Sequence, residues 1–139
     1  MRLWHKSLIP VLPRKQLLSQ WRECCCIAKN ISVNGTPNHI LVNKVLEYPM
    51  THFYTYGFAV AAEMKYRGYK CDLERFTHYF TYPYETNIIA LGDIFRPWHN
   101  DRYLKQCYYN LQEKYDCGGI KHEEWRKIKK FIIDNNLIM

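Results

Sequence analysis

The sequence lacks any unbroken apolar stretch of the length that a bilayer requires, and almost none of it alternates like a β-strand. We therefore expect no membrane span and an all-α fold. A chain of 139 residues suits one hydrophobic core and would leave two cores marginal, so a single domain over residues 1–139 is expected. Pro10 and Pro13 interrupt the short apolar stretch near the N-terminus, and no small-residue cleavage site follows, which argues against a signal peptide.

Cysteines at metal-ligand spacing are also absent. Of the six cysteines, Cys24, Cys25 and Cys26 are adjacent, and adjacent cysteines cannot build a framework of spaced disulfides. Cys117 and His122 form the nearest mixed pair, but no second pair would complete a tetrahedral zinc site. We expect reduced thiols in a cytoplasmic compartment, no metal and no organic cofactor.

Acidic residues are the scarcer charge. The chain has 13 of them against 20 lysines and arginines, which gives a formal net charge of +7. A surplus of this size attracts polyanions, so nucleic acid is the first candidate partner. Many soluble proteins are equally basic without binding nucleic acid, so charge alone does not decide between the two.

Helical periodicity and punctuation predict four longer helices. They run from about Pro13 to Asn30, from Met50 to Arg67, from an Asn100 or Asp101 cap to Gly118-Gly119, and from Lys121 to Asn135. Shorter helical pieces are expected at His39 to Leu46 and Cys71 to Phe80, and a loop from Tyr82 to Pro97. The small residues Gly57 and Ala61 in the second helix permit close contact with another helix.

Glu23 lies on the first of these helices without a cation one turn away. Its neighbours at that spacing are Ser19, Gln20, Cys26 and Ile27. A carboxylate that no local cation neutralises is available for proton transfer. The alternative is an ordinary solvated glutamate, which helical spacing alone does not exclude.

Two N-terminal motifs carry a resemblance to a known family. Arg2-Leu3-Trp4, followed by the run from Gln16 to Glu23 that ends in Trp21-Arg22-Glu23, resembles the phage pyrimidine-dimer DNA glycosylases of the endonuclease V type. In that family, a short extended segment leads into a helix whose aromatic-Arg-Glu run carries the catalytic glutamate. The resemblance implies an all-α domain of about four helices, with an extended N-terminal segment packed near the first helix.

The resemblance also implies a mechanism. The family's nucleophile is the α-amino group that begins the chain, which is that of Met1 here, and Glu23 is its acid/base partner. A terminal amine has an unperturbed pKa of about 7.7–8.0, so more of it is neutral and nucleophilic at physiological pH than of a lysine amine. The implied activity is an N-glycosylase with abasic-site lyase activity, acting through a Schiff base on pyrimidine dimers or related lesions in double-stranded DNA.

The sequence departs from the family pattern beside the glutamate. Cys26 stands where the family has a second basic residue, and Cys25 stands where it has a proline. The bulky Arg2 should protect Met1 from removal, so the amine would be that of Met1 itself. Because one expected phosphate or sugar contact is missing, the lesion preference rests on the family alone.

Further residues are candidates for contact with DNA. Basic residues close to the proposed centre in sequence would neutralise phosphates around an extruded nucleotide, tyrosines on a loop could stack on bases, and one histidine could orient a base or sugar. The candidates are Arg2, His5, Lys6, Arg14, Lys15, Arg22, Tyr82, Tyr84 and His99. The alternatives are solvated surface charges, packing tyrosines, and a structural hydrogen bond for His99.

Two other functions stay open. A non-catalytic basic protein of the same fold would bind DNA or RNA, and a blocked amine or a buried Glu23 would favour it. A nuclease of another mechanism is ranked last, because no carboxylates cluster at metal-ligand spacing to support one. We expect a monomer that acts on damaged double-stranded DNA without a membrane partner.

Overall fold

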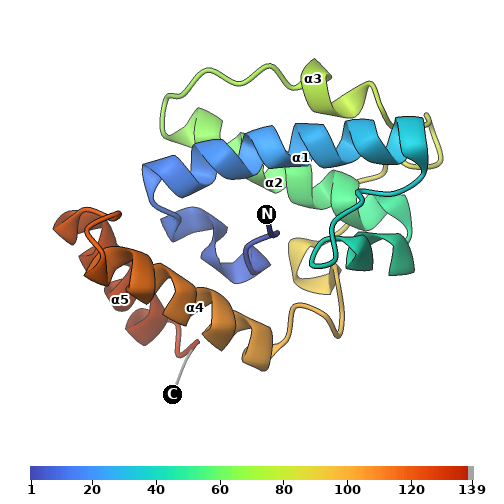
Figure 1. The fold of residues 1–139 in the computed structure, drawn as a ribbon. Helices are drawn as coiled ribbons and strands as arrows, with labels where there is room; N and C mark the ends of the chain where they lie inside the picture. The colour runs from blue at the N-terminus through green and yellow to red at the C-terminus, as the bar shows by residue number, and fades with distance from the viewer. Residues whose placement is uncertain (138–139) are drawn as a thin grey trace.

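The computed structural model describes residues 1–137, and over this range the chain is helical with no β-strand. The elements are η1 (Lys6–Val11), α1 (Arg14–Asn34), η2 (Asn43–Glu47), α2 (Met50–Tyr66), α3 (Glu74–Thr77), η3 (Leu91–Asp93), α4 (Asp101–Asp116) and α5 (His122–Asp134), where η denotes a 3₁₀ helix (Figure 1). The all-α prediction is confirmed. Within the described residues, none of the helices combines the length and the apolar character of a membrane span.

Helix α1 buries one face and leaves the other to solvent. Leu17, Trp21, Cys24 and Ile27 lie in the core, whereas Arg22 and Cys26 are exposed. The helix continues to Asn34, a turn beyond the predicted end at Asn30. It ends at Gly35, which adopts a left-handed conformation with a φ of 77° and donates its amide hydrogen to the carbonyl of Ile31.

Helix α2 runs antiparallel beside α1, and the short helix α3 covers both (Figure 1). The ring of Phe76 on α3 lies 5.7 Å from that of Trp21 on α1 and 5.4 Å from that of Phe53 on α2, centroid to centroid. Phe76 also lies directly against Gly57 of α2, where a Cβ atom would overlap its ring. The small residue predicted to allow close helix contact therefore does so, although α3 is shorter than the predicted piece from Cys71 to Phe80.

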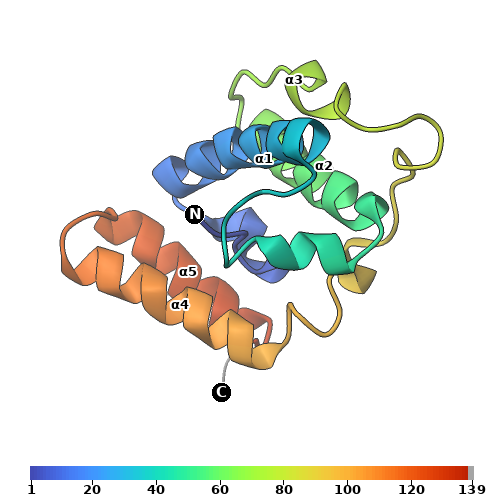
Figure 2. The same ribbon diagram turned by 45° about the vertical axis from the view of Figure 1, so that its right-hand side comes forward.

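Helices α4 and α5 form an antiparallel hairpin (Figure 2). The rings of Tyr108 and Tyr115 stack on that of Trp125, both at a centroid distance of 5.3 Å. The side chain of Asn100 accepts a hydrogen bond of 2.9 Å from the amide of Tyr103, which confirms the predicted cap.

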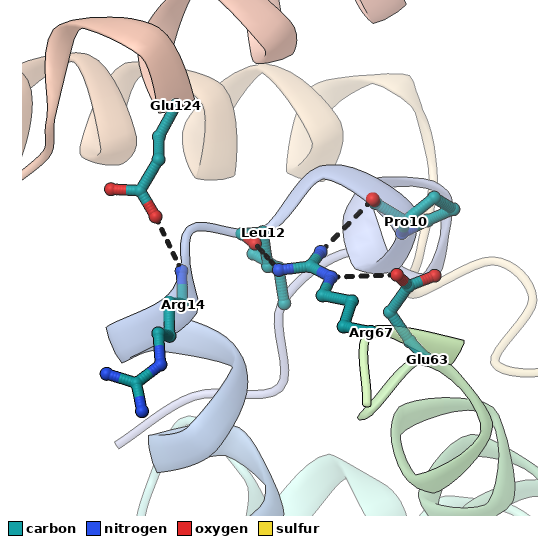
Figure 3. Close-up of polar contacts among 6 residues, drawn as sticks. All are labelled: Pro10, Leu12, Arg14, Glu63, Arg67 and Glu124. Carbon is teal, nitrogen blue, oxygen red and sulfur yellow. Dashed lines mark hydrogen bonds and ion pairs between the residues drawn. The ribbon is translucent and has the colours of Figure 1, made fainter. Parts of the chain in front are cut away.

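Polar contacts fasten α2 and α5 to the junction of η1 and α1 (Figure 3). Arg67 pairs with Glu63 at 2.8 Å and donates to the carbonyl oxygens of Leu12 and Pro10 at 2.8 and 3.1 Å. The carboxylate of Glu124 accepts from the amide of Arg14 at 2.8 Å, at the start of α1. These contacts stabilise the turn that directs residues 1–5 back along α1.

Candidate active site at the N-terminus

An extended segment formed by residues 1–5 lies between α1 and α4 (Figures 1 and 2). Gln20 of α1 is fully buried and binds this segment through its backbone. Its Oε1 accepts from the amide of Trp4 at 2.7 Å, and its Nε2 donates to the carbonyl of Arg2 at 2.9 Å. The predicted packing of an extended segment against the first helix is confirmed, and Gln20 explains it.

Residues from α2 and α4 hold the other side of the same segment. Tyr56 Oη lies 2.6 Å from the carbonyl oxygen of Trp4 and 2.9 Å from Gln20 Oε1, and Tyr103 donates to the carbonyl of Leu3. Burial raises the pKa of both phenols, so they remain protonated donors at neutral pH. The backbone that carries the amine of Met1 is therefore fixed by three helices.

Glu23 is half-buried on α1, one turn after Gln20. Burial raises the pKa of its carboxyl, and the positive charge of the N-terminal amine is the largest opposing influence. The backbone of Arg2, and then the charges of His39 and Arg22, also favour the ionised form. The amine and the carboxyl are thus electrostatic neighbours, although the described residues contain no ion pair between them within 4.0 Å.

The carboxyl of Glu23 does have a local hydrogen-bond partner, contrary to the sequence-based expectation. Gln20 Nε2 donates to Glu23 Oε2 at 3.2 Å. This partner is neutral, so it orients the carboxyl without supplying a positive charge. A raised pKa brings the carboxyl closer to the range in which one group can both accept and donate protons.

A cavity of about 640 Å³ opens beside Arg2. Its wall combines aromatic rings, cations and amides, and includes one carboxylate. The lining residues are Arg2, Ile40, Leu41, Lys44, Glu47, Tyr48, Pro97, Trp98, Asn100, Arg102, Tyr103 and Gln106. Such a wall suits a flat, polar, negatively charged ligand such as a nucleotide.

The family model described as pyrimidine dimer DNA glycosylase matches residues 1–77. The chain belongs to the pyrimidine dimer DNA glycosylase family. The matched range includes Met1, Gln20 and Glu23, whereas the α4–α5 hairpin lies beyond it. Neither the curated proteins nor the solved structures contain a match to this chain.

Four of the predicted site residues of this glycosylase family member lie together. The amine of Met1, the backbone of Arg2 and the charge of Arg22 all act on the carboxyl of Glu23, and the Arg2 guanidinium lies 5.3 Å above the ring of Trp4. Arg14 and Lys15 are exposed at the start of α1, roughly 12 Å from Glu23 at the rise of an α-helix. The Arg14 guanidinium points away from Glu124 (Figure 3) and lies over the ring of Tyr69.

Three predicted DNA contacts are instead buried in the interior: His5, Lys6 and His99. The Lys6 ammonium donates to the carbonyls of Gly92 and Ile94 at 2.8 and 2.7 Å, and His99 Nδ1 accepts from the Lys6 amide at 3.0 Å. Burial lowers the pKa of His5 to about 4 and that of His99 to about 2, so both rings are neutral at physiological pH. The hydrogen bonds of Lys6 thereby fasten the N-terminal segment to the loop before α4, which carries His99.

Tyr82 and Tyr84 are exposed, as expected for a loop, with 83% and 80% of their surface accessible. The segment that carries them passes the end of the molecule at which α1 ends, whereas the N-terminus lies between α1 and α4 (Figures 1 and 2). The structure therefore does not bring these tyrosines to the candidate active site.

Several residues of the site were not singled out from the sequence. In the sequence, Gln20 is only a neighbour of Glu23 at helical spacing, and His39 only begins a predicted helical piece. Lys44 and Arg102 line the cavity from η2 and α4. Helical spacing could have placed Gln20 on the face of Glu23, but nothing in the local sequence indicates which loop residues return to α1. Among the described residues, no group of three or more potential ligands could hold a metal ion.

Proposed function

We propose that this protein is a DNA N-glycosylase with abasic-site lyase activity, in which the Met1 amine is the nucleophile and Glu23 the acid/base. The observation that carries the proposal is the electrostatic influence of the amine on the Glu23 carboxyl, both of which lie within the range that matches the family. The fixed backbone of residues 2–4 supports it further, because a nucleophile must be held in place to react efficiently.

The chemistry proceeds in two stages. The neutral amine attacks C1′ of the sugar, the glycosidic bond breaks, and its electron pair leaves with the base, while Glu23 takes a proton from the attacking nitrogen. The nitrogen lone pair then forms the imine as the C1′–O4′ bond breaks, and the ring oxygen takes a proton from water. A base next removes a proton from C2′, a C2′–C3′ double bond forms, and the 3′ phosphate departs with its electron pair. Glu23 can serve both stages, because burial raises the pKa of its carboxyl toward the working pH.

The proposed DNA surface surrounds this pair. Arg2 and Arg22 would neutralise the phosphates next to the reacting sugar, with Lys44 and Arg102 around the cavity. Arg14 and Lys15 would contact phosphates farther along the strand, and Tyr82 and Tyr84 remain candidates for stacking at a distance. The cavity would receive an extruded nucleotide. Pyrimidine dimers in double-stranded DNA are the proposed substrate, processed by a monomer.

Reductive trapping tests the proposal. Purified protein is incubated with abasic-site and ultraviolet-irradiated duplexes under borohydride, which converts an imine into a permanent covalent adduct. The native chain should form the adduct on both duplexes, and Glu23→Gln should lower the rate of strand scission by about 10²–10⁴-fold. Glu123→Gln, at an exposed glutamate of α5, is the matched control and should behave like the native chain. Salt-sensitive DNA binding without any adduct would leave only a binding protein.

A further inference from the structure

The turn formed by residues 36–43 returns from the end of α1 toward the N-terminus (Figures 1 and 2). A small polar network fixes its shape. Asn43 Oδ1 accepts from the amide of His39 at 3.1 Å and lies 3.3 Å from Thr36 Oγ1, which in turn accepts from the amide of Asn38 at 3.0 Å. The carbonyl of His39 accepts from the amide of Asn43 at 2.8 Å. The backbone of His39 is therefore held from both sides.

The imidazole of His39 is oriented as well. Its Nδ1 accepts a hydrogen bond from the amide of Leu41 at 3.3 Å. An imidazole that accepts at Nδ1 carries its proton on Nε2 when neutral, and this tautomer follows from the hydrogen bond. The ring is half-buried, and Nε2 makes no hydrogen bond to any of the described residues. His39 thus offers one N–H donor.

His39 lies beside the wall of the cavity, because its ring contacts the backbone of Leu41. Ile40 and Leu41, the next two residues, line the cavity together with Arg2, whose neighbour Met1 carries the amine. The imidazole is also close enough to Glu23 that, when protonated, it opposes in part the rise that burial causes in the pKa of that carboxyl. A nucleotide whose C1′ faces the amine and whose base enters the cavity would pass close to the turn that carries His39.

Base release needs a group that this position can supply. When the C1′–nitrogen bond breaks, its electron pair moves onto the base and spreads to the ring oxygen of the pyrimidine. A fixed N–H donor aimed at that oxygen stabilises the charge as it develops. Glu23 cannot do this at the same moment, because its carboxylate is then accepting a proton from the attacking nitrogen.

We propose that His39 is a further catalytic residue, whose Nε2–H donates a hydrogen bond to the departing pyrimidine as the glycosidic bond breaks. The inference rests on the proposed glycosylase function and deepens it. The proton that the released base finally acquires is the one that Glu23 took from the amine, so His39 itself neither gains nor loses a proton. An abasic substrate has no base to release, so strand scission at an abasic site does not require His39.

Two duplexes and two variants test this role. On an irradiated duplex, His39→Leu should slow base release by about 10²-fold, the typical effect of removing one fixed donor. His39→Gln, which keeps an N–H donor, should recover most of the rate. On an abasic-site duplex, both variants should trap the sugar like the native chain, which also shows that their site is folded. His122→Leu, at an exposed histidine of α5, is the control.

Each other outcome overturns a defined part of the proposal. Equal slowing of His39→Leu on both duplexes would mean that His39 only holds the site together, and no slowing on either duplex would remove it from the reaction. A native chain that traps the abasic site but releases no base would overturn the role of His39 alone. A native chain that fails on the abasic site would overturn the proposed function itself.

Discussion

At the scale of single residues, Gln20 organises the candidate site. Its amide makes hydrogen bonds to the backbone of Arg2 and Trp4, to the Glu23 carboxyl and to the Tyr56 hydroxyl. One neutral side chain therefore positions both the segment that carries the amine and the carboxyl beside it. A cation in its place would lower the pKa of Glu23 and weaken it as an acid.

Replacing Gln20 tests this arrangement. Gln20→Ala leaves the buried amide of Trp4 and the carbonyl of Arg2 without their partner, and each unpaired buried group costs about 1–3 kcal/mol. We expect the free energy of unfolding, measured in urea, to fall by about 3 kcal/mol, and base release to fall further than DNA binding. Gln112→Ala, at an exposed position of α4, should change neither. An equally small effect of both substitutions would contradict this role.

The sequence could identify Glu23, but it could not show which of the other candidate residues are buried. Glu23 was predicted because the Trp21-Arg22-Glu23 run resembles a known motif. Residue type and position in the chain alone predicted DNA contacts at His5, Lys6 and His99. Lys6 instead binds the carbonyls of Gly92 and Ile94, which are more than 80 residues away in the chain. Local patterns cannot show a contact that only the folded loop creates.

At the scale of elements, α3 packs on α2 only because position 57 has no side chain. The ring of Phe76 occupies the place that a Cβ atom would take, and it contacts Trp21, Phe53 and Phe80 from there. These rings connect α1, which carries Glu23, to the outer layer of the molecule. A side chain at position 57 should therefore lower the free energy of unfolding.

Gly57→Ala forces Phe76 to move, and overpacking of this kind typically costs about 1–3 kcal/mol. Gly92→Ala is the matched control, because a Cβ atom there meets nothing within 4 Å and the backbone is not left-handed. Urea unfolding should show a clear loss for the first variant and little change for the second. Equal stability of the two variants would show that α3 is not tightly packed.

The longer helices could be predicted from the sequence, and the helical piece expected from His39 to Leu46 forms in part as η2, whereas η1 and η3 were not predicted. The limits of α2 and α4 were close to those observed, since Gly68 and Asn100 provide strong end signals. The predicted end of α1 at Asn30 is too early, because the left-handed residue that ends the helix is Gly35. Helix η1 was missed, because Pro10 inside it argues against a regular helix.

At the scale of the whole molecule, the loop before α4 closes over the N-terminal segment and buries two histidines against each other. The rings of His5 and His99 stack with centroids 5.0 Å apart, in an aromatic environment that includes Tyr103 and Phe95. Both rings are neutral in the folded protein, since burial lowers their pKa values. The same packing that fixes the candidate site therefore depends on pH.

Acid should destabilise the fold at a predictable pH. Below about pH 6.5 the unfolded chain binds protons at positions 5 and 99, whereas the folded pKa values are about 4 and about 2, so stability is lost as the pH falls. Glu23, whose pKa is raised on folding, binds at most one extra proton in the folded state, which reduces the loss of stability. His52, whose pKa is lowered on folding, increases that loss. The free energy of unfolding should fall by more than about 1.4 kcal/mol per pH unit between pH 6 and 4.5.

Urea unfolding at several pH values measures this slope. His99→Asn keeps an acceptor for the Lys6 amide and should reduce this slope by the contribution of about one proton. His122→Asn, at an exposed position, should leave the slope unchanged. A profile that is flat over this range would contradict the burial of the two neutral rings.

The central claim is that the amine of Met1 is the nucleophile, and the position of the trapped sugar tests it most directly. After borohydride reduction on an abasic-site duplex, the adduct is mapped by mass spectrometry in the native chain and in a variant with two residues added before Met1. The account predicts a sugar on the α-amino group of Met1 in the native chain, and loss of trapping with retained DNA binding in the extended one. A sugar on a lysine side chain, or trapping that survives the extension, would contradict it.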